Sequence, residues 1–382
     1  MSPSAAPVPR PRWIALDALR GLAIAAMILV NNPGDWGHVY APLLHARWHG
    51  CTFADLVFPA FLFVVGCAIV PSLGRASAGG TGPALRRVLR RSLWLVLLGL
   101  FLSAFPLVSF GKGESLFHPI ANMRFPGVLQ RIGVTYALGA LSFLFLAPRA
   151  RRIVLWAILL LYWPVLAFIP VDGSPPDLGS QTAHLAGWLD RAVFGDHIWV
   201  RGRYDPEGLL STLPALGTVL LGIEAGTVMA RASGPEKKSA DLLKNGALLM
   251  AAGAFWGWFF PINKALWTSS YALWTGGVAS SALGLLVHLV DVRGGARLVR
   301  PLSIYGVNAL LVFVGSGILG RIVGRLITVT EASIPLKTWI HRQTFAALLD
   351  PYLASLAHAV VWVLGWFAVL WVLWRRGIVW KV

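Results

Sequence analysis

The sequence predicts an all-α polytopic membrane bundle of about ten transmembrane helices. Of its 382 residues, 57% are apolar and only 13% are charged, and tryptophan occurs 18 times. A soluble domain carries about 25% charged residues, so this chain could not cover its apolar surface in water. The composition therefore excludes a water-soluble enzyme, a disordered chain and a nucleic-acid-binding module.

Stretches of roughly 20 apolar residues recur along the chain, and each can cross a hydrocarbon core of about 30 Å. The predicted spans are residues 14–33, 53–73, 92–110, 127–147, 153–171, 210–230, 245–262, 269–290, 302–321 and 352–374. Residues 1–12 and 375–382 then form terminal tails around a transmembrane domain of residues 13–374. The outer loops are 34–51, 172–209 and 322–349, and the last is expected to be interfacial or re-entrant because it mixes apolar and charged residues.

The distribution of charge predicts that both ends of the chain lie in the cytoplasm. Basic residues gather in alternate segments, as in the run Arg86, Arg87, Arg90 and Arg91, whereas most acids lie in the other segments. Cytoplasmic loops of membrane proteins are enriched in Lys and Arg. Orientation thus accounts for the net charge of +17, which needs no nucleic acid to explain it.

Ionisable residues inside spans are costly in lipid, so each is a candidate functional residue. Asp17 and Arg20 lie three positions apart on one face of the first helix, where they could form a structural ion pair. Arg131 follows Gln130 one turn into the fourth span. Its guanidinium needs an anion such as a phosphate, or a protein acid such as Glu224.

Three histidines, His38, His45 and His49, follow the first span. A single imidazole titrates near neutrality and is suited to proton transfer with a substrate. A metal site is disfavoured, because no cysteine pair or HExxH pattern accompanies them and Arg47 would repel a cation. Asp55 opens the second span, where it can orient a histidine or cap the helix.

Uncharged donors and one lysine lie near the ends of other spans. Asn31 precedes the Pro33-Gly34 pair that ends the first helix, Asn263 and Lys264 follow the seventh span, and Asn308 lies in the ninth. These groups could bind a ligand or satisfy buried backbone. The 172–209 loop combines aromatic and acidic residues, which suits a cationic or sugar ligand or an ordinary solvated loop.

Five motifs occur in order along the chain: DALRGLAIAAMILVNNPG, HARWHGCTFADLVFPAFLFVVG, RFPGVLQRIGVTYALGA, PINKALWTSSYAL and PLSIYGVNALLVFVG. Together they resemble the transmembrane acetyltransferase family of heparan-α-glucosaminide N-acetyltransferase and its bacterial relatives. The resemblance covers nearly the whole chain. It implies that acetyl groups pass from cytosolic acetyl-CoA to an amine, or a hydroxyl, of an amino sugar or glycan across the membrane.

The resemblance also implies the site residues. It assigns catalysis to His45, Asn31 and Asp55, with no metal. It assigns contacts with acetyl-CoA to Arg20, Gln130, Arg131, Asn263, Lys264 and Asn308. A homodimer in membrane lipid is implied, located in the bacterial inner membrane with the active site open to the periplasm. The interval between Asn31 and His45 is longer than in the lysosomal enzyme, and the acceptor stays unidentified.

In the expected mechanism, His45 either takes the acetyl group itself or removes a proton from the acceptor amine. Asn31 would orient His45 or donate a hydrogen bond to the oxyanion. The alternative function is a secondary transporter of amino sugars, because polar residues and a helix interrupted at Asn31-Asn32-Pro33 also fit transporters. No inverted repeat is evident, and Arg20 and Arg131 suit a phosphate better than a neutral sugar.

Overall fold

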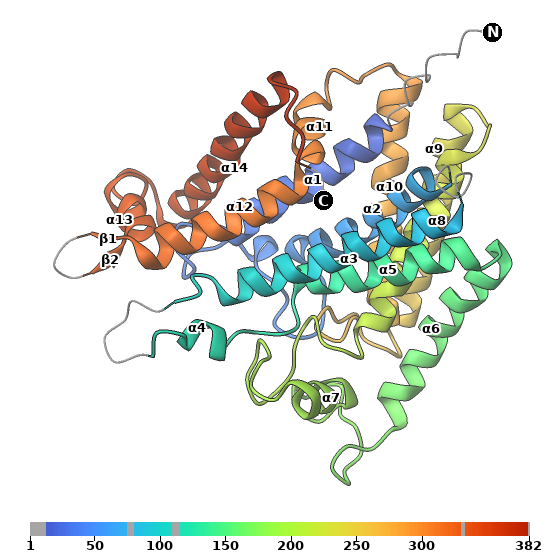
Figure 1. Ribbon diagram of the computed structural model, residues 1–382, viewed down its shortest axis with the longest axis horizontal. Coiled ribbons are helices and arrows are strands. Elements are labelled where there is room, and N and C mark those ends of the chain that lie inside the picture. The colour runs from blue at the N-terminus through green and yellow to red at the C-terminus, as the bar shows by residue number, and fades with distance from the viewer. Residues whose placement is uncertain (1–12, 75–79, 109–114, 330–332, 381–382) are drawn as a thin grey trace.

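The computed structural model describes residues 13–74, 80–108, 115–329 and 333–380, and nearly all of its regular structure is helical (Figure 1). The long helices are α1 (Ile14–Asn31), α2 (Phe53–Leu73), α3 (Thr81–Ala104), α5 (Val128–Phe145), α6 (Pro148–Phe168), α8 (Thr212–Ala230), α9 (Pro235–Trp256), α10 (Ser269–Val287), α12 (Ala309–Arg321) and α14 (Pro351–Arg375). The shorter helices are α4 (His118–Ala121), α7 (Leu185–Phe194), α11 (Arg300–Val307) and α13 (Leu336–Gln343). The all-α prediction is confirmed.

Eight helices in the described part of the chain are long and apolar enough to cross a membrane. Helices α3 and α9 overlap two further predicted spans, but the first half of α3 is rich in arginine and the first half of α9 is rich in charges of both signs. Helix α3 starts at Thr81 rather than at residue 92. Arginine is a good helix former, so the segment with Arg86 and Arg90 extends the helix while its charges stay in water.

The ninth span, predicted as one helix over 302–321, is broken at Asn308 into α11 and α12. The side chain of Asn308 donates to the carbonyl of Ile378 at 3.1 Å and accepts from the backbone N–H of Trp380 at 2.8 Å. The side-chain amide of Asn308 thus binds the segment after α14 at the point where the helix is broken. The 322–349 segment follows α12. It contains a π turn (Ile322–Leu326), the strands β1 (Thr328–Val329) and β2 (Ile334–Pro335), and α13.

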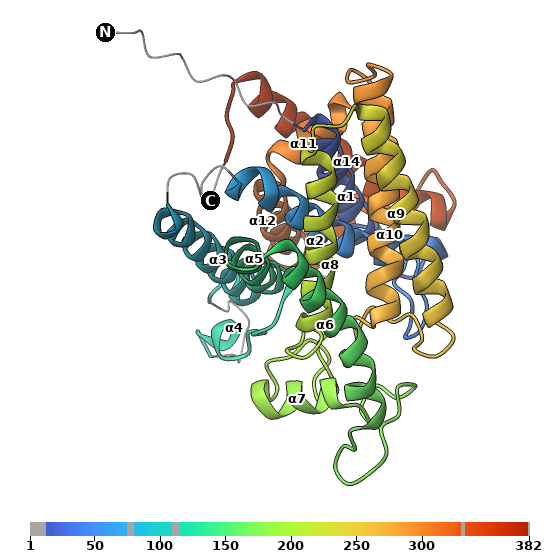
Figure 2. The ribbon, with the colours of Figure 1, turned by 90° about the vertical axis from the view of Figure 1, so that its right-hand side faces the viewer.

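The helices pack in close pairs. Figure 2 shows α9 beside α10 and α3 beside α5, and α2 packs against α8 in the same way. At the α2–α8 crossing, a Cβ on Gly66 would lie only 2.0 Å from the carbonyl oxygen of Val219, and one on Gly222 only 2.1 Å from that of Phe63. Small residues allow helix backbones to approach closely in membrane proteins. These glycines therefore fix the position of α2, which contains Asp55.

Replacing Gly66 with valine should destabilise the bundle, because the new side chain would enter the backbone of α8. Overpacking typically costs about 1–3 kcal/mol. We expect a lower midpoint of thermal unfolding in detergent for Gly66→Val. Gly365→Val is the matched control, since a Cβ at that position of α14 meets nothing within 4 Å. Equal midpoints for the two variants would contradict this description of the α2–α8 contact.

Candidate functional site

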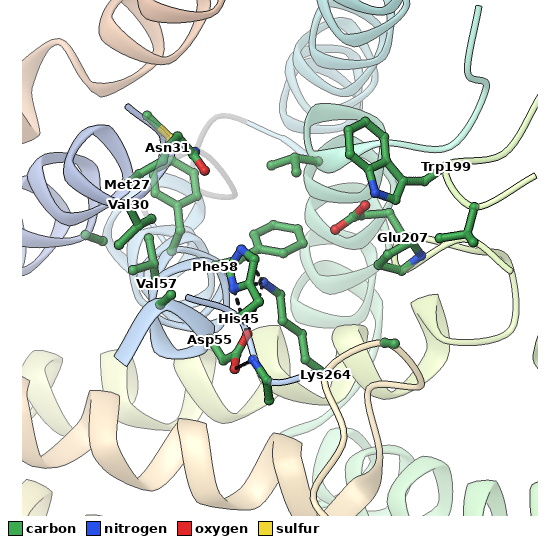
Figure 3. Close-up of a pocket in the computed structure, with 18 of the residues that line it drawn as sticks. Met27, Val30, Asn31, His45, Asp55, Val57, Phe58, Trp199, Glu207 and Lys264 are labelled. Carbon is green, nitrogen blue, oxygen red and sulfur yellow. Dashed lines mark hydrogen bonds and ion pairs between the residues drawn. The ribbon is translucent and has the colours of Figure 1, made fainter. Parts of the chain in front are cut away.

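A cavity of about 400 Å³ lies between α1, α2, the start of α5 and the loops that precede α2, α8 and α10. We call it the His45 cavity. Apolar side chains of α1 and α2 form one wall, and Figure 3 shows Trp199 and Glu207 on the far side from Asn31. The polar residues that line it include Asn31, His45, Asp55, Arg124, Glu207 and Lys264.

The carboxylate of Asp55 organises this site. Asp55 is the third residue of α2 and is fully buried. One carboxylate oxygen, Oδ2, accepts from the backbone N–H groups of Ala46 and Thr52, each at 3.0 Å. The other, Oδ1, lies 2.8 Å from Nδ1 of His45. One side chain thus caps the helix, closes the loop before it and orients the imidazole.

The contact with Asp55 determines which ring nitrogen of His45 is available. An ionised carboxylate can only accept, so the contact with Asp55 requires the hydrogen on Nδ1, and the lone pair of a neutral ring then lies on Nε2, 3.3 Å from Nζ of Lys264. Half of the His45 side chain is exposed, and the residue lines the cavity. A ring fixed in this tautomer can accept a proton or attack an acyl carbon through Nε2.

Lys264 completes the cluster (Figure 3). Its Nζ lies 3.4 Å from Oδ1 of Asp55, and 3.0 and 3.3 Å from Nδ1 and Nε2 of His45. Burial lowers the pKa of Lys264, and the nearby carboxylates of Asp55 and Glu207 act in the opposite direction. The neighbouring Asn263 shapes this loop, because its Oδ1 accepts from the N–H of Leu266 at 2.9 Å.

The 172–209 loop supplies the opposite wall. The guanidinium of Arg124 pairs with the carboxylates of Asp205 and Glu207 and lies 5.1 Å from the ring centroid of Trp199. Burial disfavours this charge, but the two carboxylates outweigh it and raise the pKa of Arg124. Acidic and aromatic residues of this loop therefore line the cavity and contact Arg124, so the loop is not only a solvated surface.

Asn31 lies at the end of α1 and away from His45 across the cavity (Figure 3). No hydrogen bond joins the two side chains in the described part of the chain, and Asp55 holds the ring of His45 instead. The predicted orienting role of Asn31 therefore belongs to Asp55. The Asn31 amide, facing the cavity, is available to a ligand.

A second cavity of about 790 Å³ adjoins the first. We call it the Arg321 cavity. Gln130 lines it and donates from Nε2 to the carbonyl of Phe125 at 3.1 Å. Both cavities are lined by Met27, Asn31, Arg124, Val128, Trp199 and Phe313. A ligand that enters one of them therefore meets the wall of the other.

Four residues that were expected to contact acetyl-CoA line neither cavity: Arg20, Arg131, Asn263 and Asn308. Arg20 lies 3.0 Å from Asp17 and also donates to the carbonyl of Gly306. Arg131 is buried, donates to Gly208 and Ser211, and lies over the ring of Trp267. In this structure these side chains bind other parts of the protein, and the predicted contacts with acetyl-CoA stay predictions.

Glu224, the acid that the sequence offered as a partner for Arg131, pairs with two other arginines instead. Glu224 lies 3.5 Å from Arg151 and 3.6 Å from Arg152. The site residues that the sequence left unassigned are Arg124, Trp199 and Glu207. Two features of the sequence could have indicated these residues. One is the acidic and aromatic composition of the 172–209 loop, and the other is the position of Arg124 just outside the fourth span.

The helices and the cavity define a polytopic membrane protein with a histidine-centred site. Residues 12–257 match the family described as "Heparan-alpha-glucosaminide N-acetyltransferase, catalytic". The chain belongs to this family of membrane acetyltransferases, as its motifs indicated.

Two curated relatives bear the name heparan-alpha-glucosaminide N-acetyltransferase. The Mus musculus protein is 30% identical over 369 residues, which cover 81% of this chain and 54% of the relative. The Homo sapiens protein is 28% identical over 434 residues, which cover 97% of this chain and 60% of the relative. The chain thus spans less than two thirds of the length of either relative.

Removing the Asp55 carboxylate should lower the pKa of Lys264 further, because the ammonium loses an opposite charge 3.4 Å away. We expect Asp55→Asn to shift the pH midpoint of Lys264 acylation by an amine-reactive probe downward, as followed by mass spectrometry. The midpoint reports the pKa, whereas easier access would change only the plateau rate. Asp172→Asn, outside the cavity, should leave the midpoint in place, and an unchanged midpoint in Asp55→Asn would contradict the assigned contact.

Proposed function

We propose that this acetyltransferase moves the acetyl group of acetyl-CoA to the amine of an amino sugar or glycan on the periplasmic side of a bacterial inner membrane. The observation that carries the proposal is the imidazole of His45, held by Asp55 through Nδ1 and flanked by Lys264, at the wall of a cavity of about 400 Å³. Ligand cavities commonly have volumes of about 300–1,000 Å³, so a thioester end and a sugar ring can share this space.

The chemistry follows from the cluster. Nε2 of His45 takes a proton from the attacking amine, the nitrogen bonds to the thioester carbonyl carbon, and the carbon–sulfur bond then breaks. The proton on His45 passes to the departing thiolate, which leaves as CoA. The Asp55 carboxylate stabilises the imidazolium that forms between these steps.

We assign the oxyanion of the tetrahedral intermediate to two donors that line this cavity. The Lys264 ammonium lies beside the His45 ring, and the Asn31 amide faces the same cavity from α1. Donors fixed before the reaction stabilise developing charge, because they need no reorganisation. The exposed ring of Trp199 and the carboxylate of Glu207 offer stacking and hydrogen bonding to a sugar acceptor.

The topology supports a site that opens to the periplasm. His45, Asp55 and Lys264 gather where α1 ends and where α2, α5 and α10 begin. A basic cluster lies at the other end of the spans, in the first half of α3, where Arg86, Arg87, Arg90 and Arg91 occur. Under the positive-inside rule this basic end faces the cytoplasm, so the site end faces outward.

A covalent acetyl-His45 route and direct transfer use the same Nε2 and differ in one observable. Enzyme incubated with labelled acetyl-CoA alone and quenched under denaturing conditions retains label on His45 in the covalent route. In direct transfer the acetyl group stays on CoA until the acceptor attacks it, so the quenched enzyme retains no label.

His45→Ala should reduce acetyl transfer by purified protein in detergent by about 100-fold or more, because the group that accepts the proton is lost. His38→Ala is the matched control. His38 pairs with Asp35 and does not line the His45 cavity, so its loss should change the rate less than about threefold. Most of the rate retained in His45→Ala would contradict the catalytic assignment, and a wild-type protein without transfer in detergent would contradict the proposed function.

A further inference from the structure

The Arg321 cavity is strongly basic. It lies where the end of α1, the end of α3 and the start of α5 meet α12 and α13. Figure 1 shows α13 and the two strands at the end of α12. Arg321, Arg325 and Lys337 line the cavity together with serine, threonine and amide side chains, and no aspartate or glutamate is among its described lining residues.

The three cations have no carboxylate partner in the part of the chain that the structure describes. Arg321 donates to the carbonyl of Gly317 at 3.0 Å, and Arg325 lies close enough to repel it electrostatically. The Lys337 ammonium is poorly solvated because it is largely buried, and this burial lowers its pKa to about 8. Arg124, on the shared wall, differs because Asp205 and Glu207 neutralise it.

The wall of the cavity also leaves room for a ligand beside these charges. Gly317, Gly320 and Gly324 line it from α12 and the following turn, and a Cβ on Gly324 would meet nothing within 4 Å. Like charges gathered without a counterion are unfavourable, and an anion that enters relieves this repulsion. Phosphate, sulfate and carboxylate groups accept charge-assisted hydrogen bonds from guanidinium and ammonium donors.

We propose that the Arg321 cavity binds an anionic group of a substrate whose reacting end lies at His45. The shared wall of six residues, Asn31 and Trp199 among them, makes the two cavities neighbours. The link to His45 rests on the proposed function. Because this cavity and His45 lie at the same, outward-facing end of the helices, the anion belongs to an acidic acceptor, such as a phosphorylated amino sugar.

The test measures binding to the purified full-length chain in detergent, without acetyl transfer. The probes are CoA and its phosphate-free counterpart pantetheine, and glucosamine 6-phosphate and its neutral counterpart glucosamine. Arg325→Gln, which changes an exposed residue, and Lys337→Gln should each weaken binding of glucosamine 6-phosphate about tenfold, as loss of one charge-assisted contact does. Arg342→Gln is the matched control, because this exposed arginine of α13 does not line the cavity.

Weaker binding of CoA with unchanged binding of pantetheine would place the donor in the cavity and overturn the assignment to an acceptor. Weaker binding of glucosamine 6-phosphate with unchanged binding of glucosamine assigns the cavity to an anionic acceptor. The proposal is overturned if anionic and neutral probes change alike, if neither changes, or if Arg342→Gln has the same effect. Wild-type protein that binds the anions but transfers no acetyl group would contradict the proposed function and leave the anion site intact.

Discussion

The pairing of the buried Asp55 carboxylate with His45 is the interaction on which the site depends. A buried carboxylate is costly unless hydrogen bonds and opposite charge compensate it, and here Ala46, Thr52, His45 and Lys264 do so. The hydroxyl of Tyr271 also donates to the main-chain carbonyl of Asp55, which ties α10 to the start of α2. Helix capping, loop closure and the orientation of the imidazole therefore have one common origin, and the site cannot be separated from the packing of α2.

The charges of the two cavities indicate how they divide the work. In the His45 cavity two of the lining cations have carboxylate partners, Lys264 with Asp55 and Arg124 with Asp205 and Glu207. In the Arg321 cavity, Arg321, Arg325 and Lys337 have no such partner among the described residues, so their charge is available for a ligand. Chemistry and recognition of charge thus lie in adjoining spaces that share Asn31 and Trp199.

The sequence was sufficient for the features that depend on local pattern. Apolar runs predicted the helices, and the ten-residue interval from His45 to Asp55 lay within one recognisable motif. It was insufficient where a polar side chain in a span bonds a distant segment. Arg131 donates to a carbonyl 77 positions away and Asn308 to one 70 positions away, and nothing local distinguishes them from ligand-binding groups. The pair of Arg124 and Asp205, 81 positions apart, was hidden for the same reason.

The central claim is that Asp55 fixes the neutral ring of His45 with its hydrogen on Nδ1 and its lone pair on Nε2. Histidine-selective ¹⁵N labelling, with the His45 signal assigned by its loss in a variant lacking that histidine, measures this tautomer directly in detergent. The account predicts a protonated Nδ1 and an unprotonated Nε2 above the pH at which the ring becomes neutral. A His45 ring that has its hydrogen mainly on Nε2 under those conditions would contradict it.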